Sequence, residues 1–149
     1  MKIYDRISAI LSRKGSDIWS IPPGASVYSA IEMMADKHIG ALLVIENGHL
    51  VGIVSERDYA RKVVLMGRSS SDTFVREIMT PFPKTVCFDC CVEDAMRTMT
   101  TNRIRHLPVV DNDRVVGMLS IGDIVNFIIA SQDQAIEHLE HYITGQYPC

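Results

Sequence analysis

The sequence predicts an α+β fold of two strand–helix–strand–strand–helix repeats, packed through their sheets with pseudo-twofold symmetry and flanked by N- and C-terminal helices. A heptad occurs twice, as GIVSERD at 52–58 and GMLSIGD at 117–123, and the segments around both copies match without a gap at the same offset of 65 residues. Both segments also show the same order of strand-like and helix-like hydrophobic patterns. A unit of about 50–60 residues is marginal alone, so we expect the two units to share a core.

The first repeat is expected at residues 15–66, after an N-terminal helix at 1–14 whose isoleucines fall on one face. Prolines and a glycine end the first strand, and Asn47-Gly48 is a strong hairpin signal between two apolar runs. The expected elements are a strand at 17–21, a helix starting after Ser26, a hairpin turning at 46–48 and a helix at 56–65.

The second repeat is expected at residues 73–131, after the polar linker GRSSSD at 67–72. A helical extension is expected to follow at 132–149, because its apolar residues recur at helical spacing. The expected elements of the second repeat are a strand at 84–88, a helix at 92–101, a hairpin of two strands at 106–110 and 114–119, and a helix at 121–130.

Composition narrows the function classes. The net charge is −3, with 15 basic and 18 acidic residues, which argues against broad binding of nucleic acid. No stretch reaches the roughly 18–20 apolar residues of a membrane span, and no secretory signal is visible. The four cysteines, Cys87, Cys90, Cys91 and Cys149, offer no obvious disulfide framework and lack the second pair that a zinc site needs. We therefore expect a cytoplasmic protein without a metal site.

The repeated heptad admits two interpretations. Ser55 and Asp58, like Ser120 and Asp123, stand where a strand ends and a helix begins, a spacing typical of a capping box. The same geometry suits a nucleotide, because a helix start and a hydroxyl can bind phosphate while a carboxylate accepts hydrogen bonds from a ribose diol. Local spacing alone leaves both interpretations open.

The segments IGALLVIENGHLVGIVSERDYARKV and IRHLPVVDNDRVVGMLSIGDIVNFI, with IMTPFPKTV before the second, resemble the CBS (cystathionine-β-synthase) domain family. The resemblance covers roughly residues 15–131, and the whole chain is similar to small bacterial stand-alone CBS pairs, or Bateman modules. It implies adenosine-containing ligands in clefts between the repeats. It places the ribose on Asp58 and Asp123, the phosphate near Ser55 and Ser120, and the adenine against Ile21 and Val86.

The two repeats differ at positions where nucleotide-binding CBS pairs often carry basic phosphate ligands. The second repeat has Arg103, Arg105 and His106 before its hairpin, whereas the first has Gly40 and Ala41 opposite the last two. We therefore predict non-equivalent pockets, with Arg105 and His106 strengthening phosphate binding at the Asp123 site. The Asp58 site is expected to take a different ligand or to be empty.

Another difference lies inside the heptad, where Arg57 stands opposite Gly122. Arg57 is a further candidate phosphate ligand. The structural alternatives are that Arg57 pairs with Glu56 or Asp58, and that Arg103 lies in solvent.

These observations predict a ligand-sensing regulatory protein rather than an enzyme, since no nucleophile–base pair or dinucleotide fingerprint is visible. We expect AMP as the first candidate ligand, then ADP, ATP or NAD(H), with S-adenosylmethionine behind them. The chain is expected to form a homodimer or higher homo-oligomer and to act on an unknown effector protein in trans. The alternative is a dimerisation scaffold that binds no ligand, and nucleic-acid binding is a distant third.

Overall fold

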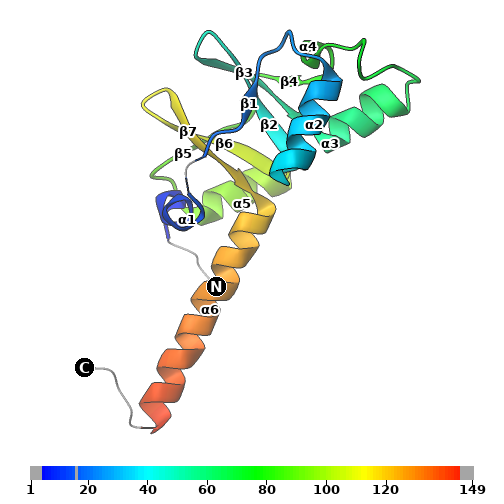
Figure 1. Cartoon of the computed structure of the whole chain (residues 1–149). Helices are drawn as coiled ribbons and strands as arrows, with labels where there is room; N and C mark the ends of the chain where they lie inside the picture. The colour runs from blue at the N-terminus through cyan, green and yellow to red at the C-terminus, as the bar shows by residue number, and fades with distance from the viewer. Residues whose placement is uncertain (1–4, 16, 145–149) are drawn as a thin grey trace.

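The computed structural model describes residues 5–15 and 17–144, without the side chains of residues 138, 141, 142 and 144. The outer ends of both predicted terminal helices, at 1–4 and 145–149, fall outside this range. The structure has one sheet in the order β1-β2-β3-β4 and a second in the order β5-β6-β7 (Figure 1). The predicted α+β fold of two related units is therefore confirmed.

The chain begins with α1 at Ile7–Lys14. Residues 20–81 then form the first sheet and its helices, and the second sheet and its helices begin at residue 86. The elements of the first set are β1 (Ser20–Ile21), α2 (Val27–Lys37), β2 (Ala41–Glu46), β3 (His49–Ser55), α3 (Glu56–Tyr59), a π-helical turn (Ala60–Val64), α4 (Val75–Ile78) and β4 (Thr80–Pro81). Those of the second are β5 (Val86–Cys87), α5 (Val92–Asn102), β6 (His106–Asp111), β7 (Arg114–Ser120) and α6 (Ile121–Thr144).

The two hairpins have the same register. Ala41 pairs with Ser55 in the first and His106 with Ser120 in the second, and both hairpins carry an irregularity at equivalent positions. The Asn47-Gly48 turn has φ values of 52° and 79°, as expected for a two-residue hairpin turn. This agreement gives the pseudo-symmetry of the two units a backbone basis.

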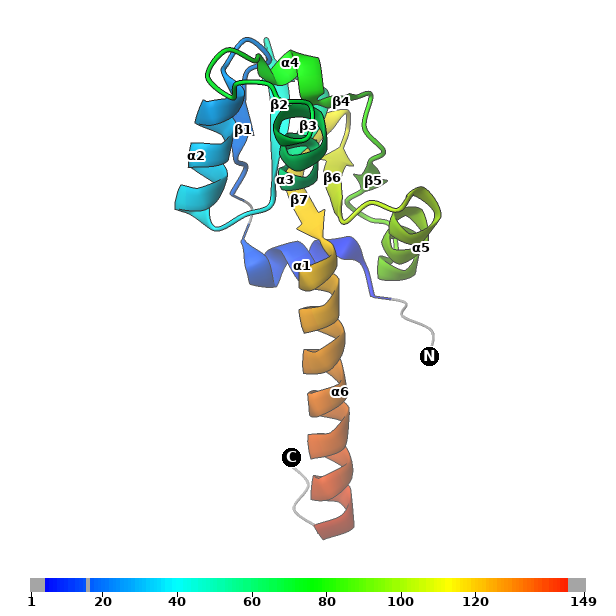
Figure 2. The ribbon, with the colours of Figure 1, turned by 90° about the vertical axis from the view of Figure 1, so that its right-hand side faces the viewer.

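Each repeat's core is completed by the segment that precedes the other repeat. Ile7 and Leu11 of α1 pack into the hydrophobic cluster of the second repeat, together with residues of β5, β6, β7, α5 and α6. Val75 and Ile78 of α4 pack into the cluster of the first repeat. Figure 2 shows α1 crossing below β7 of the second repeat. The two units are therefore interlocked rather than consecutive.

This crossing explains the glycine that opens each copy of the heptad. A Cβ at Gly52 would lie 2.7 Å from Met79 Sδ and 3.0 Å from the carbonyl oxygen of Thr80, which belongs to β4. A Cβ at Gly117 would lie 3.1 Å from a methyl group of Leu11 in α1. Glycine is therefore present at positions of β3 and β7 where a neighbouring segment leaves little room for a side chain.

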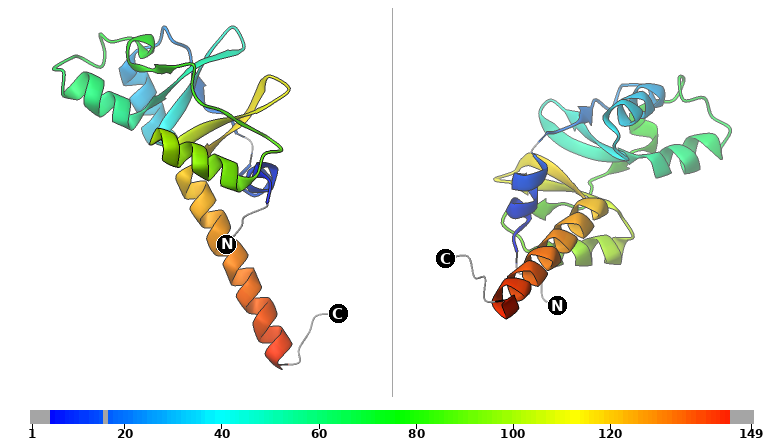
Figure 3. Two further views of the ribbon diagram at one scale, coloured as in Figure 1. Left: turned by 180° about the vertical axis from the view of Figure 1, so that it is seen from behind. Right: turned by 60° about the horizontal axis from the view of Figure 1, so that its bottom comes forward.

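The last helix is longer than the pattern of the second repeat predicts. The sequence predicts a helix at 121–130 followed by a helical extension, whereas α6 is continuous from Ile121 to Thr144. Its first turns pack on the body through Ile124 and Phe127. Figure 1 and the left view of Figure 3 show the rest of α6 projecting away from the two sheets.

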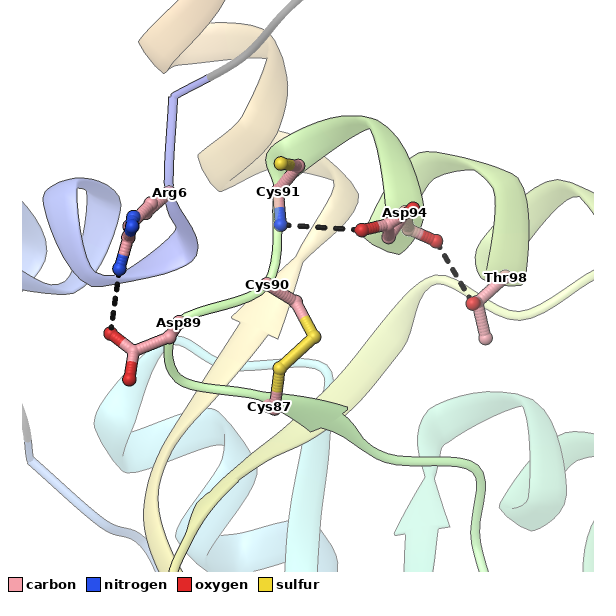
Figure 4. Close-up of a disulfide and its surroundings, with 7 residues drawn as sticks. All are labelled: Arg6, Cys87, Asp89, Cys90, Cys91, Asp94 and Thr98. Carbon is pink, nitrogen blue, oxygen red and sulfur yellow. Dashed lines mark hydrogen bonds and ion pairs between the residues drawn. A yellow bond between two sulfur atoms is a disulfide. The ribbon is translucent and has the colours of Figure 1, made fainter.

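One prediction about the cysteines is wrong. Cys87 and Cys90 form a disulfide, with their Cα atoms 5.2 Å apart (Figure 4). The turn between β5 and α5 brings them together, since the Cys90 amide donates a hydrogen bond to the Cys87 carbonyl at 3.2 Å. Cys91 is a half-buried free thiol at the start of α5. The C-x-x-C spacing within a turn is the sequence signal for this pair, since the turn brings the two residues close together.

Candidate functional site

A cavity of about 320 Å³ lies where the two repeats meet, and both contribute to its walls. The first repeat supplies the start of β2, the end of β3 and the start of α3, and β4 supplies Thr80. The second repeat supplies the residues that lead into β6 and its first residue, His106. The lining residues are Gly40, Ala41, Ile53, Ser55, Glu56, Arg57, Asp58, Thr80, Ile104, Arg105 and His106. We call this cavity the inter-repeat cleft.

Ser55 and Asp58 form the predicted capping box on one wall of the cleft. The Ser55 hydroxyl oxygen accepts from the Asp58 amide at 3.2 Å, and Asp58 Oδ2 accepts from the Ser55 amide at 2.9 Å and the Ser55 hydroxyl at 3.0 Å. The other oxygen, Oδ1, pairs with Lys62 Nζ at 3.1 Å. Capping fixes the Asp58 carboxylate in place, with only 14% of its side chain exposed.

Arg105 and His106, which the sequence groups with Asp123, line the cleft that contains Asp58. His106 also lies close enough to Asp123 for that carboxylate to raise its pKa, so the predicted phosphate role at Asp123 stays a prediction. Alignment of the repeats shows which positions are equivalent in the two units, but it does not show which residues meet between the units. In the cleft, the residues that lead into β6 face the end of β3. A Cβ on Gly40 would lie 3.5 Å from the His106 ring. Small residues in the first repeat thus leave room for large basic ones from the second.

The Asp123 site has a different neighbour. Ser120 and Asp123 also form a capping box, with distances of 2.8 and 3.1 Å. Asp123 Oδ2 is bound by Lys14 Nζ of α1 at 2.7 Å, and the same ammonium group donates to the Met118 carbonyl oxygen at 2.6 Å. A cavity of about 270 Å³ adjoins Asp123 and Lys14 on the α1–α6 side. The two pockets differ in their basic neighbours, since Arg105 and His106 line the cleft at Asp58 whereas Lys14 lies at Asp123. Which pocket binds phosphate more strongly stays a prediction.

Next to the inter-repeat cleft is a concavity of about 620 Å³ with four arginines in its wall. The lining residues are Arg57, Arg61, Asn102, Arg103, Ile104 and Arg105. Arg57 donates to the carbonyl oxygen of Arg103 at 3.2 Å, so the predicted alternative of pairing with Glu56 or Asp58 is wrong.

These arginines share one electrostatic property. Arg103 is exposed, in agreement with the solvent alternative. Within the described ranges, no ion pair joins any of the four arginines to a carboxylate. The concavity, which we call the arginine groove, therefore presents uncompensated positive charge.

Two predicted contacts are not in the cleft. Ile21 and Val86 are 4% and 7% exposed, and each lies in the hydrophobic cluster of its own repeat. The apolar walls of the cleft come instead from Ile53 and Ile104, with Thr80 at its edge. Ile104 was detectable from its position before Arg105, but Thr80 reaches the cleft only through the pairing of β4 with β3.

His106 is the one cleft residue with a clear pKa shift in the described structure. Burial lowers the pKa of His106 below its usual value; the Lys14 ammonium lowers it further, Asp123 raises it, and Arg105 lowers it. The imidazole is therefore neutral at pH 7 and can become charged when an anion approaches.

The described residues include no cluster of three or more side chains suited to hold a metal ion. None of the helices in the same ranges is long and apolar enough to cross a membrane. The cleft offers a fixed carboxylate, apolar walls and neighbouring guanidinium groups. This combination suits recognition of a small molecule with a polar ring, an apolar ring and an anionic group.

Comparison with known proteins identifies relatives of this arrangement. The sequence model of the CBS domain matches twice, at residues 7–65 and 75–130. The mitochondrial CBS domain-containing protein CBSX3 of Arabidopsis thaliana is 41% identical over 141 residues, which cover 91% of this chain and 68% of that protein.

Two solved structures are also similar. A protein with CBS domains from Burkholderia ambifaria is 45% identical with a TM-score of 0.83, over 86% of this chain and 96% of that one. The CBS domain pair of protein MJ0100, solved with 5′-methylthioadenosine and S-adenosyl-L-methionine, is 26% identical with a TM-score of 0.77, over 87% and 99% of the two chains.

Proposed function

The chain belongs to the CBS domain family as a tandem pair, and we propose that it is a regulatory protein that binds an adenine nucleotide in the inter-repeat cleft. One observation carries the proposal: the cleft combines the capped Asp58 carboxylate with Arg57, Arg105 and His106, drawn from both repeats. The adenosyl ligands of the MJ0100 pair support the same ligand class.

The nucleoside part is assigned from the walls of the cleft. The cap and Lys62 use three of the roughly four acceptor sites of the Asp58 carboxylate. Asp58 can therefore accept one ribose hydroxyl directly, and a second once the Ser55 hydroxyl rotates away from it. Ile53 and Ile104 provide apolar surface for the adenine ring. The Ser55 hydroxyl donates a hydrogen bond to Asp58, so its predicted phosphate contact requires that hydroxyl to rotate.

The phosphate part is assigned to the basic side of the cleft. Arg57, Arg105 and His106 can form charge-assisted hydrogen bonds to phosphate oxygens. Because the adjoining arginine groove adds Arg61 and Arg103, it favours ligands with more than one phosphate. AMP, ADP, ATP and NAD(H) remain the candidate ligands. The sequence puts AMP first, and we propose the di- and triphosphates ahead of it because of the arginine groove.

A ligand bound between two repeats can change their relative arrangement, because it binds some arrangements better than others. We propose that this change is reported to an effector protein in trans, with no catalytic step in this chain. A cytoplasmic location remains a prediction, since one relative carries a mitochondrial description in its name.

Calorimetric titration tests the proposal directly. Protein verified to be free of nucleotide would be titrated with AMP, ADP, ATP, NAD⁺, NADH and S-adenosylmethionine. We expect saturable binding of at least one adenine nucleotide at micromolar concentration. Absence of heat and of ligand-induced thermal stabilisation with all six compounds would contradict the proposal.

The second candidate is a scaffold without a ligand. The observation that favours it is that Lys14 and Lys62 already neutralise Asp123 and Asp58. A scaffold would show no binding in the titration, while its oligomeric state would be the same with and without nucleotide.

A further inference from the structure

The start of α1 is bound to the turn between β5 and α5, which the Cys87–Cys90 disulfide closes. Three backbone hydrogen bonds join residues 5–8 to residues 88–92. They run from the Ile7 amide to the Cys90 carbonyl oxygen at 2.9 Å, from the Ser8 amide to that of Phe88 at 3.1 Å, and from the Val92 amide to that of Asp5 at 2.8 Å. Figure 4 shows Arg6, the residue before α1, paired with Asp89 of the same turn. The disulfide therefore lies within the segment that holds α1 on the second repeat.

The first repeat has the same three hydrogen bonds, so it provides an internal comparison. There α4 is the crossing segment, and the turn that binds it lies between β1 and α2. The equivalent bonds run from the Val75 amide to the Ala25 carbonyl oxygen at 2.8 Å, from the Arg76 amide to that of Pro23 at 3.0 Å, and from the Val27 amide to that of Thr73 at 2.8 Å. At the repeat offset of 65, Cys87 and Cys90 correspond to Pro22 and Ala25.

The two turns differ in the covalent feature that restricts their conformations. Pro22 and Pro23 fix two φ angles of the first turn, and they do so under all redox conditions. In the second turn the disulfide has this role, because closing the loop removes conformations that the open turn could adopt. The turn that holds α4 therefore has a constant stiffness, whereas the stiffness of the turn that holds α1 depends on the state of one disulfide.

We propose that Cys87–Cys90 is a redox-active pair, reduced by a dithiol and reoxidised by another disulfide, and that its state determines how firmly α1 is held. Cys87 is exposed and Cys90 is half-buried, and exposed disulfides are the more readily reduced ones. A thiolate of the dithiol attacks Cys87 Sγ, the S–S bond breaks, and the Cys90 thiolate takes up a proton. The second thiol of the donor then displaces Cys87 from the mixed disulfide, and the Cys87 thiolate takes up the second proton. Two electrons and two protons thus pass from the dithiol, which becomes a disulfide, to the pair.

Reduction loosens α1 but does not release it. Ile7 and Leu11 are 0% and 4% exposed, and their burial in the second core is independent of the disulfide. The far end of the helix is Lys14, which binds Asp123 Oδ2 at 2.7 Å and the Met118 carbonyl oxygen at 2.6 Å. The redox pair and the Asp123 carboxylate therefore lie at opposite ends of one helix of 8 residues.

Hydrogen exchange of the full chain, measured by NMR with and without dithiothreitol, tests the proposal. Reduction should accelerate exchange of the three amides that join α1 to its turn by about 10- to 30-fold, because a short closed loop is opened. The three equivalent amides of the first repeat are the internal control, and their exchange should not change. Equal acceleration in both turns would indicate global destabilisation and overturn the proposal, as would no acceleration in either.

Two variants separate the disulfide from the other cysteines. Cys91→Ser keeps the pair and should keep the full response to dithiothreitol. Cys87→Ser combined with Cys90→Ser should show the fast exchange at α1 without reductant and no response to it. Exchange in this double variant as slow as in the oxidised protein would overturn the role of the disulfide in holding α1. Circular dichroism would verify that both variants fold.

Reversibility is tested by thiol labelling after equilibration of the chain in mixtures of reduced and oxidised glutathione, where two monothiols replace the dithiol. Mass spectrometry of the labelled peptides should show Cys87 and Cys90 becoming accessible together as the reduced form increases, and protected together as it decreases. A pair that stays reduced at every ratio, or stays oxidised in reduced glutathione alone, would overturn the proposal. None of these results depends on nucleotide binding.

Discussion

Replacement of the first heptad glycine, Gly52→Ala, tests the interlocked packing of the two repeats. The new Cβ would meet Met79 Sδ at 2.7 Å and the Thr80 carbonyl oxygen at 3.0 Å. The methionine side chain can move, but the Thr80 carbonyl oxygen belongs to the backbone of β4, which is held in place by its pairing with β3. Relief of the contact therefore requires β4 to shift.

The size of the effect follows from two opposing contributions. Overpacking of this kind costs about 1–3 kcal/mol. Alanine gains roughly 0.5–1 kcal/mol over glycine inside a strand, because it loses less backbone entropy on folding. The net loss expected for Gly52→Ala is about 1–2 kcal/mol, which lowers Tm by roughly 3–6 °C in a chain of this size.

The matched control is Gly117→Ala in the second heptad. Its Cβ would lie 3.1 and 3.3 Å from two methyl groups of Leu11, and no backbone atom is close. Because a leucine side chain can rotate, we expect a loss of less than about 1 kcal/mol. Urea unfolding of both variants gives the comparison. Equal losses, or a larger one for Gly117→Ala, would refute the assignment of β4 and α1 as the crossing segments.

Three further outcomes are expected. Asp58→Ala should destabilise the fold by about 1–2 kcal/mol through loss of the cap. Asp58→Asn keeps an acceptor oxygen, so it should lose less stability but still lose nucleotide affinity. Thermal unfolding measures the loss of stability, and calorimetry measures the loss of affinity. The lowered pKa of His106 means that the folded protein binds fewer protons than the unfolded one below about pH 6.5, so its contribution to stability is present above that pH and decreases as the pH falls. His106→Asn should flatten this part of the stability profile, and an unchanged profile would exclude His106 as the cause. Reduction of Cys87–Cys90 should cost about 2 kcal/mol or less, since the loop it closes is very short; a Cys87→Ser chain should then show no response to the reductant, and a response there would point to another cysteine.

Much of the fold was predictable because the same order of strand and helix patterns occurs twice in the chain, so each repeat supports the assignment of elements in the other. The first hairpin was predicted from Asn47-Gly48 and the second from the apolar runs at 106–110 and 114–119, and the structure confirms both with matching register. The crossing of α1 and α4 was not predictable from periodicity. An amphipathic face shows that a helix is buried, but it does not show which of two similar cores it joins.

The site was predicted in composition better than in arrangement. Asp58, Ser55, Arg105 and His106 were all singled out from the sequence, yet only the packing of one repeat on the other shows that they share a cleft. The same limitation affected Lys14, which reaches Asp123 because α1 packs on the distant repeat. Contacts between the units depend on how the pseudo-twofold axis relates one repeat to the other. Alignment of the two repeat sequences gives no information about that packing.

The assignment of the nucleotide to the Asp58 side of the structure is the central claim, and the affinity of Arg105→Ala for ATP tests it most directly. Arg97→Ala is the control, because Arg97 is exposed on α5, pairs with Glu93 and lines neither cavity nor groove. Loss of charge-assisted hydrogen bonds should weaken ATP binding by about 10- to 100-fold in Arg105→Ala and leave Arg97→Ala unchanged. Unchanged binding in Arg105→Ala, with loss of binding in Asp123→Asn, would place the ligand at the other pocket and contradict the account.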